Sequence, residues 1–309
     1  MSTAFLFNEI FLQHNAGLPH PENPQRLLAI LHGLKQHGFM EQLIHVDPSA
    51  ATEDHILLCH SREHFEFIRK ISVRGSYQID PDTHVSSASF DAAMVAAGAA
   101  IRAVDGIMAN EFSNAFAAVR PPGHHATRDQ AMGFCLFNNI AIAARWLTSH
   151  YHLKRVLIMD WDVHHGNGTQ DIFWEDPSII YISLHKKYHY PGTGWEHETG
   201  GGSAKGTKIN FPIDRPSQYM EFFTKSLAAA EKFEPEFILI SCGFDAHEDD
   251  PLGNLHLKNE TYAEMTRLMF EFAEKFKHQR VFSILEGGYD YDALSNAGSA
   301  HTKVLLEHS

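Results

Sequence analysis

The stretch Val156-Leu-Ile-Met-Asp-Trp-Asp-Val-His-His-Gly-Asn-Gly168 joins a short apolar run to a dense group of polar side chains. Its first four residues have the length and composition of a strand buried on both faces, and the glycines that follow indicate a loop. Similar apolar runs occur throughout the chain, and the first residues predict one more strand. These strands are expected over residues 1–7, 115–119, 179–184, 237–240 and 281–285.

Amphipathic or alanine-rich segments of helical length separate these strands. They cover residues 24–36, 91–108, 139–148, 218–233 and 261–276. Alternation of strands and helices predicts an α/β fold, with a mostly parallel sheet between two layers of helices. No linker-like segment divides the sequence, so we expect one domain over residues 1–309.

Composition excludes several classes of protein. Lys and Arg total 25 against 38 Asp and Glu, and the net charge of −13 argues against binding nucleic acid through its phosphates. Three cysteines are too few for a disulfide framework and indicate a reducing, cytoplasmic setting. We expect no membrane association, because no stretch approaches the ~20 apolar residues of a membrane-spanning helix. The 23 histidines suggest metal or proton-transfer sites without locating them.

Polar residues follow the predicted strands at the points where the strands end. They are His124 and His125, then Asp160, Asp162, His164 and Asn167, then His185, Asp245 and Tyr289. The carboxyl ends of parallel strands meet at one edge of the sheet, where α/β proteins bind their ligands. We therefore expect these side chains to form one site.

Three of these residues form a candidate metal site. Asp162 and His164 are two apart, so in an extended segment their side chains point the same way, and Asp245 would reach them from another strand. Two carboxylates and one imidazole suit a divalent ion and leave a coordination position open. That pattern is typical of a catalytic metal rather than a structural one.

The remaining residues supply acid–base chemistry. Asp160 and Asn167 could each fix the tautomer of an imidazole in the His124-His125 pair. A nearby imidazole can take the proton of a metal-activated water that attacks a carbonyl, and Tyr289 could donate a hydrogen bond to the oxyanion. The set predicts a metal-dependent amidohydrolase.

Eight motifs in this order resemble the zinc-dependent histone deacetylase family, more closely its class II and bacterial deacetylase-like branch. They are HPENPQR (20–26), RPPGHHA (120–126), GFCLFNN (133–139), DWDVHHGNGTQ (160–170), SLH (183–185), YPGTG (190–194), GFDAHEDDPLG (243–253) and LEGGYD (285–290). The resemblance implies the three-layer arginase/deacetylase fold, with its active site at the C-terminal strand ends.

The family's metal and catalytic residues match positions of this chain. The resemblance implies zinc ligands at Asp162, His164 and Asp245, a histidine–carboxylate pair of His124 with Asp160, a general base at His125 beside Asn167, and a catalytic Tyr289. It also implies a potassium ion held by Asp160, Ser183, Leu184 and the backbone of Asp162 and His164. A second monovalent ion would use the loop around Phe173.

Substrate-binding positions can be matched in the same way. Gly133, Phe134 and Tyr190 match the tunnel that grips a lysine stem, and Arg26 matches a residue near the cavity through which acetate leaves. Asp82 matches a carboxylate at the rim that binds substrate backbone, with Asp80 as the competing choice. Leu252 occupies a rim position where polyamine-specific relatives carry a carboxylate.

These matches predict a zinc-dependent enzyme that removes acetyl or related acyl groups from lysine in peptides or proteins. One alternative is a deacetylase of acetylpolyamines or other small amides, which the apolar Leu252 disfavours. Another is a non-catalytic acyl-lysine reader, in which we would expect a broken ligand set or a missing tyrosine. Whether the substrate is a histone stays open, and a homo-oligomer is compatible with the sequence. His165, His185 and His247 lie in the motifs with supporting or unassigned roles.

Overall fold

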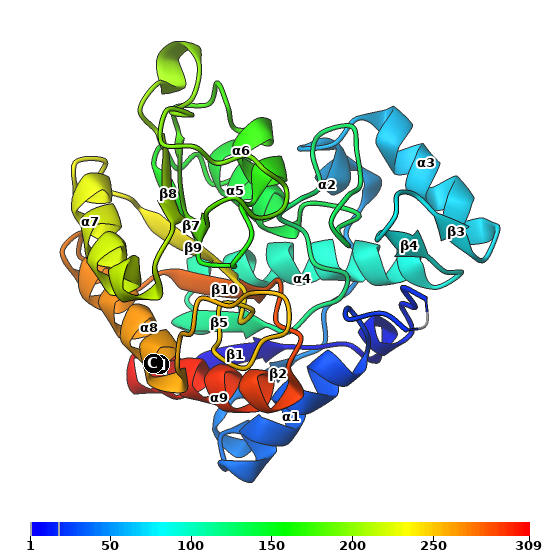
Figure 1. Ribbon diagram of the computed structural model, residues 1–309, viewed down its shortest axis with the longest axis horizontal. Helices are drawn as coiled ribbons and strands as arrows, with labels where there is room; N and C mark the ends of the chain where they lie inside the picture. The colour runs from blue at the N-terminus through cyan, green and yellow to red at the C-terminus, as the bar shows by residue number, and fades with distance from the viewer. Residues whose placement is uncertain (1, 18) are drawn as a thin grey trace.

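An eight-stranded parallel sheet forms the centre of the computed structural model, which describes residues 2–17 and 19–309 (Figure 1). Its strands are β1 (Thr3–Leu6), β2 (Ile44–Val46), β5 (Asn114–Ala117), β6 (Val156–Asp160), β7 (Ile179–Lys186), β8 (Lys208–Ile213), β9 (Phe237–Cys242) and β10 (Val281–Leu285). Their order is β2-β1-β5-β10-β9-β6-β7-β8, and every neighbouring pair is parallel. The predicted α/β fold is confirmed.

Helices cover both faces of this sheet. The longer ones are α1 (Gln25–Gln36), α3 (Arg62–Val73), α4 (Ser89–Met108), α5 (Asn139–Ser149), α7 (Tyr219–Glu231), α8 (Asn259–Glu274) and α9 (Tyr291–Glu307). Helix α9 contacts both α1 and α8, whereas α4 contacts α5, so the sheet lies between two helical layers (Figure 1).

Shorter elements complete the fold. They are the helices α2 (Glu53–Leu57) and α6 (Asn167–Ile172), the antiparallel pair β3 (Tyr77–Gln78) and β4 (His84–Val85), and 3₁₀ turns at Glu9–Leu12, Met40–Gln42, Gly202–Ala204 and Pro216–Gln218. Among the described residues, no helix is both long enough and apolar enough to cross a membrane.

Sequence and burial explain the central strands. Every residue of β6, β9 and β10 is buried, as expected for strands covered by helices on both faces. Hydrogen-bonding side chains mark where two of the helices begin. The Ala141 N–H donates to the Asn138 side chain at the start of α5, and the Ala293 N–H donates to Asp290 at the start of α9. Each of these helices therefore begins immediately after a loop that carries motif residues.

Strand register aligns the ends of the central strands. Asp160, the last residue of β6, pairs with Ser183 of β7 on one side and with Ser241 of β9 on the other. The ends of β6 and β9 therefore lie at nearly one level, whereas β7 continues beyond Ser183 to Lys186. The candidate residues meet above this carboxyl edge of the sheet. All the strands and helices predicted from the sequence are present, with ends that differ by at most two residues; Met1 lies outside the described residues.

Candidate active site

Asp162, His164 and Asp245 converge in the structure as the spacing predicts. The His164 Nδ1 lies 3.0 Å from Asp162 Oδ1 and 3.1 Å from Asp245 Oδ2. One ligand atom from each residue lies within 4.8 Å of the others, and all three residues are buried. The cluster could hold one metal ion.

Backbone groups orient the two carboxylates of this cluster. The Gly287 N–H donates to Asp162 Oδ2 at 2.7 Å, and the Val163 N–H donates to Asp245 Oδ1 at 2.8 Å. Each carboxylate therefore presents its other oxygen to His164. Position 287 has to be glycine, since a Cβ there would overlap Asp245 and approach Asp162 Oδ2.

The electrostatics of the cluster fit a divalent cation. Burial and the adjacent Asp162 charge raise the pKa of Asp245 to about 7. Two carboxylates held this close in a buried site repel each other, and a cation between them removes that repulsion. Two oxygen donors and one imidazole nitrogen are also ligands that zinc accepts.

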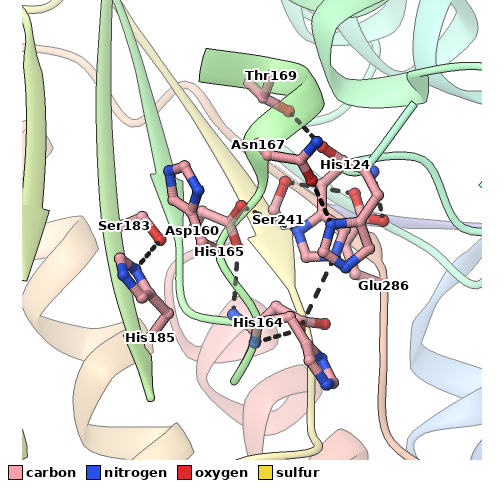
Figure 2. Close-up of polar contacts among 12 residues, drawn as sticks. His124, Asp160, His164, His165, Asn167, Thr169, Ser183, His185, Ser241 and Glu286 are labelled. Atoms are coloured by element: carbon pink, nitrogen blue, oxygen red, sulfur yellow. Dashed lines mark hydrogen bonds and ion pairs between the residues drawn. The ribbon is translucent and has the colours of Figure 1, made fainter. Parts of the chain in front are cut away.

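His124 and His125 lie beside the cluster with opposite electrostatics. The His124 Nδ1 is 3.0 Å from Asp160 Oδ2. Burial opposes its charged form, but the carboxylates of Asp160, Asp162 and Glu286 outweigh burial and raise the pKa of His124 to about 10. Figure 2 shows Glu286 close to His124. Its carboxylate accepts hydrogen bonds from the backbone N–H groups of Gly123 and His124.

His125 is held as a neutral ring. Its Nδ1 lies 2.7 Å from Asn167 Oδ1, and because that amide oxygen only accepts, Nδ1 carries the hydrogen and Nε2 is left free. Burial and the positive charges of His124 and His164 hold the pKa of His125 well below 6.5. A bound dication would act in the same direction as those charges.

Tyr289 retains its hydroxyl proton in this environment. Burial, aided by the carboxylates of Asp245 and Asp162 and opposed by Arg26, raises its pKa well above 10. The Arg26 guanidinium lies 4.9 Å from the centre of the tyrosine ring and donates to the backbone oxygens of Gly288 and Glu286. Arg26 therefore supports the turn that carries Tyr289.

A cavity of about 250 Å³ leads to these groups. It is lined by Pro21, Asp82, Pro122, His124, His125, Gly133, Phe134, His164, His189, Tyr190, Leu252, Gly287 and Tyr289. The Tyr190 ring stands nearly perpendicular to His125, with ring centres 5.1 Å apart, and Phe134 packs edge-on against Tyr289 at 5.9 Å. Gly133, Phe134, Tyr190, Asp82 and Leu252 line this cavity as inferred from the sequence, whereas Arg26 and the alternative rim residue Asp80 do not.

The structure separates the two candidate rim acids. Asp82 lines the cavity, and its backbone oxygen lies 3.0 Å from the His20 Nε2. Asp80 instead accepts the backbone N–H groups of Asp82 and Thr83 and so closes a turn. Burial and the neighbouring Asp80 raise the pKa of Asp82 to about 6.

The candidate potassium residues lie beneath the metal cluster. Asp160 and Ser183 are register neighbours, and Leu184 follows Ser183 on β7. The resemblance places a second monovalent ion at the loop around Phe173. In the structure, backbone oxygens of the segment after Phe173 accept hydrogen bonds from a lysine ammonium group. The fully buried Lys208 Nζ donates to the backbone oxygens of Asp176 and Ile179.

Two of the buried histidines with unassigned roles hold the loop that carries Tyr190. The His165 Nδ1 lies 2.8 Å from Thr193 Oγ1, and the His185 Nε2 donates to the Gly194 oxygen at 2.9 Å. Figure 2 shows the contact of His185 with Ser183 on the same strand. These residues shape the tunnel wall from behind.

Three residues near the site were given no individual role from the sequence. His189 lines the cavity and stacks on His164 with ring centres 4.9 Å apart. Glu286 and Asp250 are buried carboxylates that accept backbone N–H groups around the site. Glu286 and Asp250 lie inside the LEGGYD and GFDAHEDDPLG motifs, and that position was the one signal available in the sequence; nothing marked His189.

The fold places a buried Asp-His-Asp cluster that could hold a metal ion at the carboxyl edge of a parallel sheet, and comparison with known proteins gives the class of protein. Residues 20–305 match the model of the histone deacetylase domain. The chain is 38% identical over 298 residues to a probable deacetylase of Archaeoglobus fulgidus, an alignment that covers 94% of this chain and 82% of that protein. It is 35% identical over 325 residues to histone deacetylase 5 of Arabidopsis thaliana, which covers 98% of this chain but only 48% of the plant protein.

A solved structure extends the similarity to three dimensions. The crystal structure of the HDA15 HD domain superposes with a TM-score of 0.94 at 37% identity, covering 99% of this chain and 89% of that one. The chain belongs to the histone deacetylase family, whose members are in general zinc-dependent, and it is a deacetylase-type hydrolase with the arginase/deacetylase fold.

Proposed function

We propose that this protein removes acetyl or related acyl groups from the Nε of lysine in peptides or proteins. One observation carries the proposal: a single cavity is lined both by aromatic rings and by His125, His164 and Tyr289. Phe134 and Tyr190 suit a chain of methylenes, because their flat apolar faces can cover it on both sides. The apolar Leu252 at the mouth favours a peptide-borne lysine over a substrate with a second ammonium group.

Asp162, His164 and Asp245 would hold the zinc ion, which when bound polarises the acyl carbonyl and activates water. His125 takes the proton of the attacking water at Nε2, since Asn167 accepts the hydrogen on Nδ1. The protonated His125 then delivers that proton to the leaving lysine amine. The His124–Asp160 pair supplies fixed charge beside the reacting groups.

Tyr289 donates its hydroxyl hydrogen to the oxyanion that develops on the acyl oxygen. Its raised pKa keeps the hydroxyl protonated at neutral pH, so the donor is always present. Asp82 at the rim would accept N–H groups of the substrate backbone, and the backbone at Gly133 allows close approach of the lysine stem. Asp160, Ser183 and Leu184 would hold a potassium ion beneath the site.

The first test is Tyr289→Phe. Loss of an oxyanion donor commonly lowers the rate by ~10²–10³, so this variant should fall by that factor on an acetyl-lysine peptide while its zinc content stays equal to that of the parent. Full activity would remove the tyrosine from the proposed mechanism. A chelator should abolish the activity of the parent, and added zinc should restore it.

The second test defines the substrate class. Acetyl-lysine peptides, longer acyl-lysine peptides and acetylspermidine are compared by kcat/KM on the zinc-loaded enzyme. We expect the peptides to be preferred. Preference for acetylspermidine would assign the site to polyamines, and turnover of none of these substrates by zinc-loaded protein would favour a non-catalytic reader.

A further inference from the structure

Asp250 is a buried carboxylate whose four hydrogen bonds all come from backbone N–H groups. Only 6% of the residue is exposed. Its Oδ1 accepts from Leu252 at 2.9 Å and from Gly253 at 3.2 Å. Its Oδ2 accepts from Tyr289 at 2.7 Å and from Asp290 at 3.4 Å.

These bonds join two walls of the cavity that are far apart in the sequence. Leu252 lines the mouth, and its backbone oxygen accepts from the His189 Nε2 at 3.0 Å. Tyr289 is bound by the other carboxylate oxygen of Asp250 and lies on the turn between β10 and α9. A single side chain therefore connects the rim of the cavity to the residue at its base.

The turn that carries Tyr289 depends on such support. Gly287 and Gly288 precede the tyrosine, and Gly288 has a φ of +117°, so this segment has no side chains of its own to fix it. Asp290 holds the far end by capping α9. The Asp250 bond to the Tyr289 N–H fixes the residue itself.

We propose that Asp250 is a positioning residue, which holds the Tyr289 backbone so that the phenol points at the acyl oxygen. The inference rests on the proposed function, because it takes the role of Tyr289 from there. A displacement of about 1 Å at a reacting group can cost ~10²-fold in rate. The geometry therefore predicts a defect in kcat rather than in substrate binding.

Asp250→Asn tests this proposal, because the amide keeps the shape but can accept on one side only. We expect kcat to fall ~10- to 100-fold, with KM and zinc content close to those of the parent. The matched control is Asp249→Asn, a neighbouring carboxylate whose side chain is 67% exposed, which should leave kcat unchanged. Asparagine can keep the Tyr289 bond by turning its oxygen to that side, so Asp250→Ala, which accepts on neither side, is assayed as well. The parent's kcat in both variants would overturn the proposal.

A double-mutant cycle tests whether Asp250 acts through Tyr289. In a Tyr289→Phe background, assayed at high enzyme concentration, Asp250→Asn should lower the rate little further, since the hydroxyl that it positions is absent. An equal fold-loss in both backgrounds would refute the positioning role and leave the proposed function intact. Full activity of Tyr289→Phe alone would instead refute the proposed function. If Asp250→Asn yields no zinc-loaded protein, Asp250→Ser, which is smaller and keeps one acceptor, goes through the same cycle.

Discussion

Single atoms decide the geometry of the metal cluster. Asp162 and Asp245 each commit one oxygen to a backbone N–H and turn the other toward His164. Gly287 supplies one of those N–H groups and also leaves room for both carboxylates. The absence of a Cβ at Gly287 is as important as the ligands themselves, because a Cβ there would occupy the space of the Asp245 carboxylate.

Gly287→Ala should therefore lose zinc and activity together. The new methyl group would overlap the Asp245 carboxylate and approach Asp162, so two of the three ligands would have to move. We expect zinc content, measured on the purified protein, to fall well below one ion per chain, and deacetylation to fall with it.

Gly298→Ala is the matched control. A methyl group at Gly298, inside α9, would meet Ile30 only at ordinary contact distances of 3.6 and 3.9 Å. This variant should keep zinc and activity, and helix propensity predicts a small gain in stability. A Gly287→Ala protein that binds zinc fully would show that the carboxylates can retreat without loss of ligation.

The sequence predicts the residues that carry the chemistry of the site better than the residues that hold them in place. Asp162, His164 and Asp245 follow strands of a parallel sheet, so their meeting follows from the general geometry of such sheets. His189 and Asp250 act through contacts between loops, and no periodicity encodes the path of a loop. Asp250 also follows Asp249, which carries the same side chain but is exposed, so residue type alone does not mark the buried carboxylate.

At the scale of elements, the buried ammonium group of Lys208 links the edge strand β8 to the neighbouring strand β7 and to the loop that precedes β7. The Lys208 Nζ donates to the Asp176 and Ile179 oxygens at 3.2 and 2.8 Å and to Thr207 Oγ1 at 2.7 Å. Thr207 gives its own hydrogen to the Ala204 oxygen, so all three acceptors require a hydrogen from the lysine. Although burial lowers the pKa of Lys208 to about 7, only the charged form satisfies all three.

Lys208→Met should destabilise the protein without changing the site. The methionine fills the same space but leaves two carbonyls and a hydroxyl without a donor, at a cost of about 1–3 kcal/mol. Urea unfolding should show this loss in the midpoint, with an unchanged slope. The exposed Lys205→Met is the control. Equal stability of the two variants would mean that other donors reach those carbonyls.

Edge strands are also where the sequence predicts the fold least well. The interior strands stand out as apolar runs, but β8 reads Lys-Ile-Asn-Phe-Pro-Ile, with polar residues and a proline among the apolar ones. Such residues are typical of strands with one unpaired edge. The other edge strand, β2, has three residues that are exposed or partly exposed. A search of the sequence for continuous apolar runs therefore finds the central strands of the sheet and misses both edge strands.

Across the whole molecule, a substantial part of the histidine excess lies in the interior. Ten of the 23 histidines are buried: His14, His60, His64, His124, His125, His164, His165, His185, His247 and His301. Several of them hold structure in neutral form. The Asn138 N–H donates to the His60 Nε2, whose Nδ1 donates to the Thr127 oxygen, so a proton on Nε2 would break the first bond.

Neutral buried histidines make stability depend on pH with a definite sign. Burial lowers the pKa of His60 and of His301 to about 3, against 6.5 for an exposed ring. As the pH falls below 6.5 the unfolded chain takes up protons that the folded chain refuses. Each such residue therefore contributes stability that is complete above pH 6.5 and is lost toward pH 3.

The His301→Gln substitution measures how much one buried histidine contributes to this pH dependence of stability. His301 bridges the hydroxyls of Thr266 and Ser283 at 2.7 and 2.8 Å, and a glutamine amide can donate and accept there without ionising. Between about pH 4 and 6 the free energy of unfolding should fall with pH less steeply than in the parent, by about 1.4 kcal/mol per pH unit. Urea unfolding across this range measures the slope, with His32→Gln on the exposed face of α1 as the control. The comparison of slopes does not depend on how much stability the substitution itself removes.

Parallel slopes for parent and His301→Gln would mean that the folded protein protonates His301 as readily as the unfolded chain does. In that case this buried ring would not contribute to the acid sensitivity of the protein.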